Sequence, residues 1–413
     1  MSDTTAQTQS PYWKRNIAVF LSGQAVTLFG SMLVHYAVQW HITLTRDSGV
    51  AMALLSLSMA VPLFLVSPFA GVWADRYSKK LLINIADAVI AVVTLLMAVV
   101  FSLGFEHIAL LLACVAARGF GQGVQTPAVN SFVPELVPAE NLVRINGISS
   151  SIQSAAMFLA PIAAAGLIQF LPIQAVLYID VATAAVGISM LLFFVKVPPK
   201  ARNPEQKSPW REMLEGLKYM KTQAFIMKLL ILNVVFNLLM TPAAVLTPLQ
   251  TARDFGADEW RLAAIELAFF IGMAAGGAII GAWGGFRNKT YTITGACALM
   301  GVSCAGLGLM DNFALYLGCM GIAGLSIPMF NAPLMTVMQV RIDPEYMGRV
   351  FSALAMLGGI MMPVGMTVWG PLADAVRIDW LMIVSGAGIV CASALIIGSK
   401  TLREAGVLPK QEE

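Results

Sequence analysis

The sequence predicts an all-α integral membrane protein in which twelve transmembrane helices form two pseudo-symmetric six-helix bundles. Three observations lead to this fold class. Of the 413 residues, 58% are hydrophobic and only 12% are charged, whereas a soluble domain carries about 25% charged residues. This composition excludes a soluble globular enzyme. The apolar residues also form blocks of roughly 20–28 residues, the length that crosses a bilayer. Finally, motifs of the first half recur in the second.

Twelve apolar spans are predicted, six on each side of the longest hydrophilic interruption. They cover about 17–43, 49–73, 81–104, 107–129, 143–170, 172–195, 226–250, 260–285, 290–310, 313–339, 346–374 and 378–399. The chain therefore divides into a cytoplasmic tail (1–16), a first bundle (17–195), a cytoplasmic linker (196–225), a second bundle (226–399) and a second cytoplasmic tail (400–413). Turn-forming residues lie between the spans, for example Asp343-Pro344.

The linker contains one helical pattern. Ser208-Pro209 is typical of a helix start, and Trp210, Leu214 and Leu217 follow at helical spacing. A short amphipathic helix on the inner membrane surface is expected, with a disordered linker as the alternative.

The distribution of basic residues predicts the orientation. With the amino terminus inside, 21 of the 26 Lys and Arg residues lie in cytoplasmic segments, four lie in outer loops, and Arg118 lies within a span. Cytoplasmic loops carry the excess of Lys and Arg in membrane proteins. Both termini are therefore expected in the cytoplasm.

The remaining bulk numbers exclude other classes. The net charge of +3 is too small and too scattered to indicate a nucleic-acid partner. The five cysteines lie in apolar stretches without CxxC spacing, so neither disulfides nor a metal site is expected. The sequence has no phosphate-loop motif, so ATP hydrolysis by that route is not expected. The polar first sixteen residues do not resemble a signal peptide.

The two halves of the chain repeat each other. Matching residues at the same helix positions are Gly71 and Gly281 (offset 210), Pro127 and Pro328 (offset 201), and Pro161 and Pro363 (offset 202). An even number of helices in each copy places both copies the same way up, as parallel repeats about an axis along the membrane normal. Such halves can rock about a midplane cavity, which favours alternating access over a fixed pore.

Residues 71–80, Gly-Val-Trp-Ala-Asp-Arg-Tyr-Ser-Lys-Lys, resemble the signature between the second and third helices of the major facilitator superfamily. Segments 23–26, 126–130, 324–328, 344–352 and 362–365, and Glu266 with Gly272-Met273, resemble its macrolide-efflux branch of drug:proton antiporters. The resemblance covers essentially the whole chain. It implies the major facilitator fold and a multi-pass protein of the bacterial inner membrane, a monomer surrounded by lipid. That protein would export amphipathic, macrolide-like small molecules in exchange for protons, with no cofactor beyond the proton gradient.

Four ionisable residues lie within the spans: Asp87, Arg118, Asp180 and Glu266. Such residues are costly in a membrane and indicate function by default. Counted from Lys80 and from Pro127, Asp87 and Arg118 lie roughly 10–14 Å from the cytoplasmic face, so an ion pair between them is predicted, either structural or part of a gate. Asp180 and Glu266 lie nearer the outer side without an obvious basic partner.

Low dielectric disfavours the charge of an unpartnered carboxyl, so Glu266 and Asp180 are candidates for proton coupling. Asp87 is kept as a third candidate. The alternative for each is a hydrogen-bonded packing residue.

The resemblance also implies a cytoplasmic conformational latch. Its residues here are Gly71, Asp75, Arg76, Lys80 and Arg349. In the family the aspartate faces the amino end of the eleventh helix, where the helix dipole favours a carboxylate. The alternative for Lys80 is a positive anchor on the inner surface.

Polar side chains recur at helical spacing in the spans that the family places around the cavity. The candidate cavity residues are Gln24, Ser31, His35, Gln39, Gln122, Gln125, Asn233, Asn237 and Asn331, together with Met362 on the softer apolar wall. The alternative is that each polar group forms a helix–helix hydrogen bond.

Other functions on the same fold stay open: export of a siderophore, flipping of a lysophospholipid, or a non-transporting sensor. An enzyme is not expected, because no metal-ligand cluster or nucleophile–base pair is visible.

Overall fold

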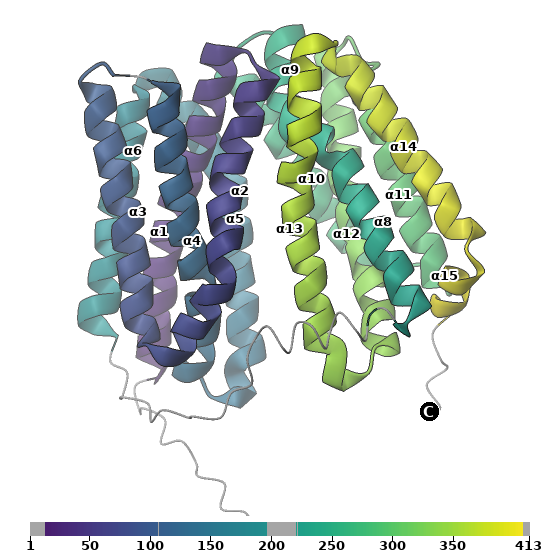
Figure 1. Cartoon of the computed structure of the whole chain (residues 1–413), viewed down its shortest axis with the longest axis horizontal. Helices are drawn as coiled ribbons and strands as arrows, with labels where there is room; N and C mark the ends of the chain where they lie inside the picture. Colours follow the sequence, from purple (N-terminus) through teal and green to yellow (C-terminus); the bar gives the residue numbers. More distant parts are fainter. Residues whose placement is uncertain (1–12, 106, 196–219, 221, 408–413) are drawn as a thin grey trace, which may run out of the picture. The chain divides into compact units, whose positions relative to one another are not determined.

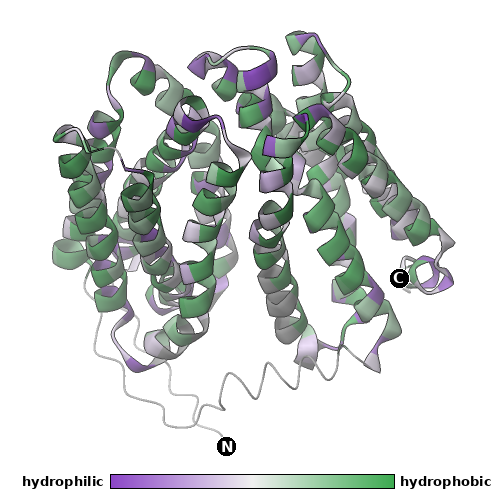
Figure 2. Ribbon diagram, turned by 45° about the horizontal axis from the view of Figure 1, so that its top comes forward, coloured by the Kyte–Doolittle hydropathy of each residue, from purple (hydrophilic) through white to green (hydrophobic). Residues whose placement is uncertain are grey.

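The structure, a computed structural model, describes residues 13–105, 107–195, 220 and 222–407 (Figure 1). Within these ranges, long α-helices occupy all of the predicted spans. The amphipathic helix predicted within the linker lies outside the described residues. Figure 2 shows hydrophobic residues along the middle of the helices and hydrophilic residues near their ends, the pattern of a chain that crosses a bilayer.

The helices of the first half are α1 (Trp13–Arg46), α2 (Gly49–Arg76), α3 (Lys79–Ser102), α4 (Ile108–Leu136), α5 (Leu142–Phe170) and α6 (Ile173–Ser189). One π-helical turn, Met190–Phe194, extends α6. The helices α1 to α6 begin and end within a few residues of the predicted spans. The largest difference is at α4, which continues through Pro127 and Pro134 to Leu136.

The helices of the second half are α8 (Ala224–Thr241), α9 (Thr247–Asp254), α10 (Glu259–Trp283), α11 (Lys289–Leu307), α12 (Phe313–Arg341), α13 (Pro344–Ala375), α14 (Ile378–Gly398) and the short α15 (Lys400–Ala405). A π-helical turn, Pro242–Leu246, joins α8 to α9 in one span.

Eleven spans of the described part are long and apolar enough to cross a membrane. Helix α13 coincides with the eleventh predicted span, although several of its side chains lie outside the description. The predicted all-α membrane fold is confirmed.

Polar caps mark several helix starts. The side chain of Ser78 accepts a hydrogen bond from the Leu81 amide at α3, Asn288 accepts one from Thr290 at α11, and Asn312 caps α12. These residues satisfy amides that have no partner inside the helix. Gly284 ends α10 with a left-handed φ of 72°, a conformation that glycine adopts without strain.

By their internal contacts the residues group into two compact units. The first unit comprises residues up to 38 and 58–206, and the second comprises residues 39–57 and those from 207 onward. The last part of α1, the loop after it and the start of α2 therefore pack with the second half of the chain. The loop between α1 and α2 lies at the end that the charge distribution predicts to face outside.

In the second unit α10 and α12 approach closely at glycines. A Cβ atom added to Gly272 would meet the backbone of Gly321, and one added to Gly276 would meet the backbone of Leu325. A Cβ added to the neighbouring Gly277 would meet nothing within 4 Å. Small residues at helix interfaces allow this backbone contact in membrane proteins. The same two helices, α10 and α12, line the pocket that is described below.

Candidate functional site

A buried ion pair lies at the centre of the first unit. Arg118 of α4 donates from Nη1 to Oδ2 of Asp180 in α6 over 2.6 Å, and only 8% and 1% of the two side chains are exposed. Oδ2 also accepts a hydrogen bond from Thr94 Oγ1 of α3 (3.3 Å), and Oδ1 accepts one from Ser31 Oγ of α1 (3.4 Å). Arg118 Nη1 donates to Thr94 as well. One carboxylate thus connects four helices of the unit.

The predicted pairing of Arg118 with Asp87 is wrong, and so is the expectation that Asp180 has no basic partner. The cause is the depth assigned to Arg118. The prediction counted its depth from Pro127, as if the helix ended there, but α4 continues to Leu136. Arg118 lies ten residues after Ile108, about 15 Å from the outer end of α4. Asp180 lies seven residues into α6, at a comparable depth.

Asp87 is buried in the same unit and is satisfied by a neutral partner. Its side chain is 6% exposed and hydrogen-bonds the side chain of Gln125. Gln125 Nε2 in turn donates to Gln24 Oε1 over 3.3 Å. The three residues form a polar chain across α3, α4 and α1. The role of Asp87 and Asp180 in proton coupling stays a prediction.

Glu266 of α10 differs from both aspartates. Its side chain is half-buried, and within the described part of the second unit no hydrogen bond or ion pair involves it. A carboxyl group in this situation is stabilised neither by a cation nor by a donor, so the cost of its charge in low dielectric is not offset.

An apolar pocket lies between α10 and α12. It has a volume of about 400 Å³ and is lined by Met273, Ile327, Pro328, Asn331, Ala332 and Met335. Asn331, a predicted cavity residue, supplies its amide. Met273 follows Glu266 by seven residues, so both side chains lie on the same face of α10, about 10 Å apart along the axis. The pocket and the unpaired carboxyl are therefore on one side of the helix.

The predicted cavity residues are all at least partly accessible. His35 and Asn331 are exposed. The half-buried ones are Gln24, Ser31, Gln39, Gln122, Gln125, Asn233, Asn237 and Met362. Several also make hydrogen bonds inside their own unit, such as Asn237 Nδ2 to the Asn233 carbonyl over 2.8 Å. Both the cavity role and the helix-bonding role therefore have support, and the cavity role stays a prediction.

The predicted cytoplasmic latch is only partly described. The surroundings of Gly71 and the side chains of Asp75 and Arg349 lie outside the description, and Arg76 is exposed. Lys80 donates to the carbonyl oxygens of Leu192 (2.8 Å) and Val195 (2.7 Å). A lysine at the end of a helix satisfies carbonyls that have no partner. Lys80 thus caps the π-helical end of α6 inside the first unit.

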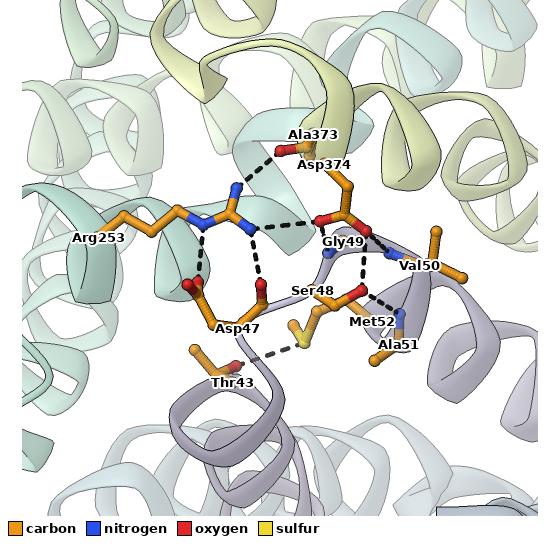
Figure 3. Close-up of polar contacts among 10 residues, drawn as sticks. All are labelled: Thr43, Asp47, Ser48, Gly49, Val50, Ala51, Met52, Arg253, Ala373 and Asp374. Atoms are coloured by element: carbon orange, nitrogen blue, oxygen red, sulfur yellow. Dashed lines mark hydrogen bonds and ion pairs between the residues drawn. The ribbon is translucent and has the colours of Figure 1, made fainter.

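One cluster was not predicted from the sequence. Arg253 of α9 joins Asp47 of the α1–α2 loop and Asp374 of α13 at the end predicted to face outside (Figure 3). In the sequence Arg253 stands out only as one of four basic residues in the outer loops. The one local signal was a charged residue at three predicted span boundaries, which is common in membrane proteins.

Comparisons with known proteins agree with this architecture. Residues 16–366 match the Major Facilitator Superfamily. Macrolide efflux protein A of Streptococcus pyogenes is 28% identical over 383 residues, which cover 92% of this chain and 94% of that protein. The Multidrug efflux pump Tap of Mycobacterium tuberculosis is 22% identical over 393 residues, 91% of each chain.

Among solved structures, the nucleoside transporter NupG has the same fold, with a TM-score of 0.71 at 14% identity over 94% of this chain and 99% of that one. The helices, the repeated halves and the family match lead to one conclusion. This chain is a membrane transporter, not an enzyme, and it belongs to the Major Facilitator Superfamily.

Proposed function

We propose that this protein exports amphipathic small molecules, macrolide-like drugs among them, in exchange for protons. It acts by alternating access as a monomer in the bacterial inner membrane, with both termini in the cytoplasm. The similarity to Macrolide efflux protein A and to the Multidrug efflux pump Tap over nine-tenths of the chain supports this proposal.

The observation that carries the proposal is the apolar pocket beside an unpaired carboxyl. Met273 and Met335 give the pocket soft, polarisable walls, which adapt to irregular apolar ligands. A volume of about 400 Å³ lies within the range of small-molecule sites. Asn331 supplies one polar group that orients a bound molecule. The pocket thus suits the apolar body of an amphipathic substrate.

Glu266 provides the coupling. In low dielectric the carboxylate is more stable when it is neutralised, either by a proton or by a cationic group of the substrate. A proton and a substrate amine therefore compete for the same carboxyl, which is the requirement for exchange. Asp180 is already neutralised by Arg118, and Asp87 is bound by Gln125, so Glu266 is the first candidate.

The test is substrate-dependent proton flux in proteoliposomes, with an erythromycin-type macrolide as substrate and a pH-sensitive dye in the lumen. The wild type should move protons only when macrolide is present, and Glu266→Gln should abolish the flux. Glu259→Gln, the same change in the first turn of α10, is the matched control and should retain it. Macrolide transport that is unaffected by Glu266→Gln would remove Glu266 from the coupling. Transport of a siderophore or a lysophospholipid in place of the macrolide would favour the alternative cargoes.

A further inference from the structure

The cluster around Arg253 joins three separate parts of the second unit. Its Nε donates to Asp47 Oδ1 (2.7 Å) and its Nη2 to the Asp47 carbonyl (2.7 Å) and to Asp374 Oδ1 (3.2 Å). Its Nη1 donates to the carbonyl of Ala373 over 2.7 Å. Figure 3 shows the guanidinium group between the α1–α2 loop and the end of α13. We call Asp47, Arg253 and Asp374 the outer clasp.

Asp374 also binds the start of α2. Its Oδ1 accepts a hydrogen bond from the Gly49 amide (2.6 Å), and its Oδ2 accepts from the Val50 amide (3.0 Å) and from Ser48 Oγ (2.7 Å). These are the first amides of α2, which have no partner inside the helix. A carboxylate at a helix amino end is favoured by the dipole. A side chain at the end of α13 thus caps the amino end of α2, although the two helices are far apart in the sequence.

The backbones beneath the clasp are in direct contact. A Cβ atom on Gly49 would overlap the Gly370 carbonyl and come too close to Ala373, and one on Gly370 would overlap Ala53 and Gly49. Asp47 has a left-handed φ of 44°, a conformation that costs free energy for a residue other than glycine. Arg253 holds both the carbonyl and the carboxylate of Asp47, which stabilises this conformation.

We propose that the outer clasp is a latch that closes the outer end and must open once in every transport cycle. The inference rests on alternating access and is independent of the substrate. Residues 39–57 belong by sequence to the first repeat, yet they pack in the second unit. Rocking of the two repeats would require residues 39–57 to leave their contacts in the second unit, and the clasp holds these contacts together. The clasp residues are partly exposed to solvent, and ion pairs of this kind are weak enough to break reversibly.

Two neighbouring ion pairs serve as contrast. Arg377 binds Asp379, two residues further along the chain, and Arg261 binds Asp258 within one turn. The two residues of each pair are close in the sequence, and the link from Asp379 to a separate segment is made by its other oxygen, Oδ1, which accepts from Gln250 Nε2 of α9 over 3.1 Å. Removal of either should leave the outer end closed.

The first test measures how often the outer end opens. In a variant whose five cysteines are replaced by alanine, Met52→Cys introduces one thiol at a position that is 1% exposed and packs beside Thr43. A membrane-impermeant maleimide should label it only when the clasp is open. Asp374→Ala and Arg253→Gln should each raise the labelling rate by about tenfold, which corresponds to about 1.4 kcal/mol. Asp374→Asn should have a smaller effect because it keeps an acceptor oxygen. Arg377→Gln is the matched control and should leave the rate unchanged.

Equal labelling rates in all variants, with monodisperse behaviour in size-exclusion chromatography, would overturn the proposal. This arm needs no substrate, so it stands even if the protein does not transport macrolides.

The second test locks the clasp. Ser48→Cys with Asp374→Cys, again without the native cysteines, replaces the Ser48–Asp374 hydrogen bond by a disulfide. Oxidation should abolish transport and reduction should restore it, because a latch that cannot open stops the cycle. Full transport in the oxidised protein would show that the contact stays closed throughout the cycle, which would overturn the proposal.

Discussion

The ion pair between Arg118 and Asp180 makes a prediction whose magnitude follows from the structure. The 2.6 Å pair is almost completely excluded from solvent, and removal of one partner of such a pair typically costs about 3–5 kcal/mol because the other charge is left uncompensated. Asp180→Asn keeps an acceptor oxygen for Arg118, so its cost should be near 3 kcal/mol, and Asp180→Leu, which keeps none, should cost about 5 kcal/mol.

The double variant separates the ion pair from its surroundings. Arg118→Met with Asp180→Leu removes both charges and fills the space with apolar side chains. Replacement of a whole buried pair by apolar residues is often neutral or stabilising. We therefore expect the double variant to regain most of the stability lost by either single variant.

A native cysteine allows the stability of the first unit to be measured. Cys114 is the one cysteine in the first half of the sequence. It is 8% exposed and lies one helical turn before Arg118. In a variant that keeps only Cys114, the reaction of this thiol with a fluorogenic maleimide during chemical denaturation reports the unfolding of the first unit. Single variants as stable as the wild type, or a double variant that loses the sum of both single effects, would refute the reasoning.

Two further predictions concern the second unit. Gly276→Val should destabilise it by about 1–3 kcal/mol because the new side chain meets the backbone of Leu325. At Gly277 an added Cβ would meet nothing within 4 Å, so Gly277→Val should be tolerated. Thermal unfolding in detergent distinguishes the two variants, and equal melting temperatures would contradict the close contact. Ala332→Phe should fill the pocket and weaken macrolide binding by about tenfold, with Ala332→Ser as the control; unchanged affinity in equilibrium binding would show that the pocket does not hold substrate.

The positions of the helices could be predicted from the sequence because a bilayer imposes a simple rule. Any segment that crosses it must be about 20 residues of mainly apolar helix. The depth of a residue within a helix was harder to predict, because the sequence does not mark the inner end of α4: the predicted span stops at residue 129, whereas the helix continues to Leu136. Pro127 and Pro134 lie inside α4, and Pro242 lies within the span formed by α8 and α9. Membrane helices tolerate such prolines because neighbouring groups bind the freed carbonyls.

The partners of the charged residues could be predicted least. Asp47 and Arg253 are 206 residues apart, and Ser48 and Asp374 are 326 apart, so no local pattern connects them. Lys80 binds two backbone carbonyls, and a backbone carbonyl leaves no signature in the sequence. Glu266 is the opposite case. It could be identified as a candidate because it is an ionisable residue within an apolar span, a feature that the sequence shows without any knowledge of its partners.

The Arg118–Asp180 pair, the outer clasp and Glu266 differ in their surroundings, and we expect them to have different roles in the transport cycle. The Arg118–Asp180 pair is buried and fully compensated, so breaking it costs several kcal/mol, and we expect it to stay intact while the first unit moves. The outer clasp is partly exposed, so its ion pairs cost about 1 kcal/mol or less each to break, and it can open in every cycle. Glu266 has no partner among the described residues, so under the proposed function it can exchange a proton for a cationic substrate without a bond being broken first. Variants of the pair should therefore fail in folding, variants of the clasp should change how often the outer end opens, and variants of Glu266 should change coupling while stability is retained.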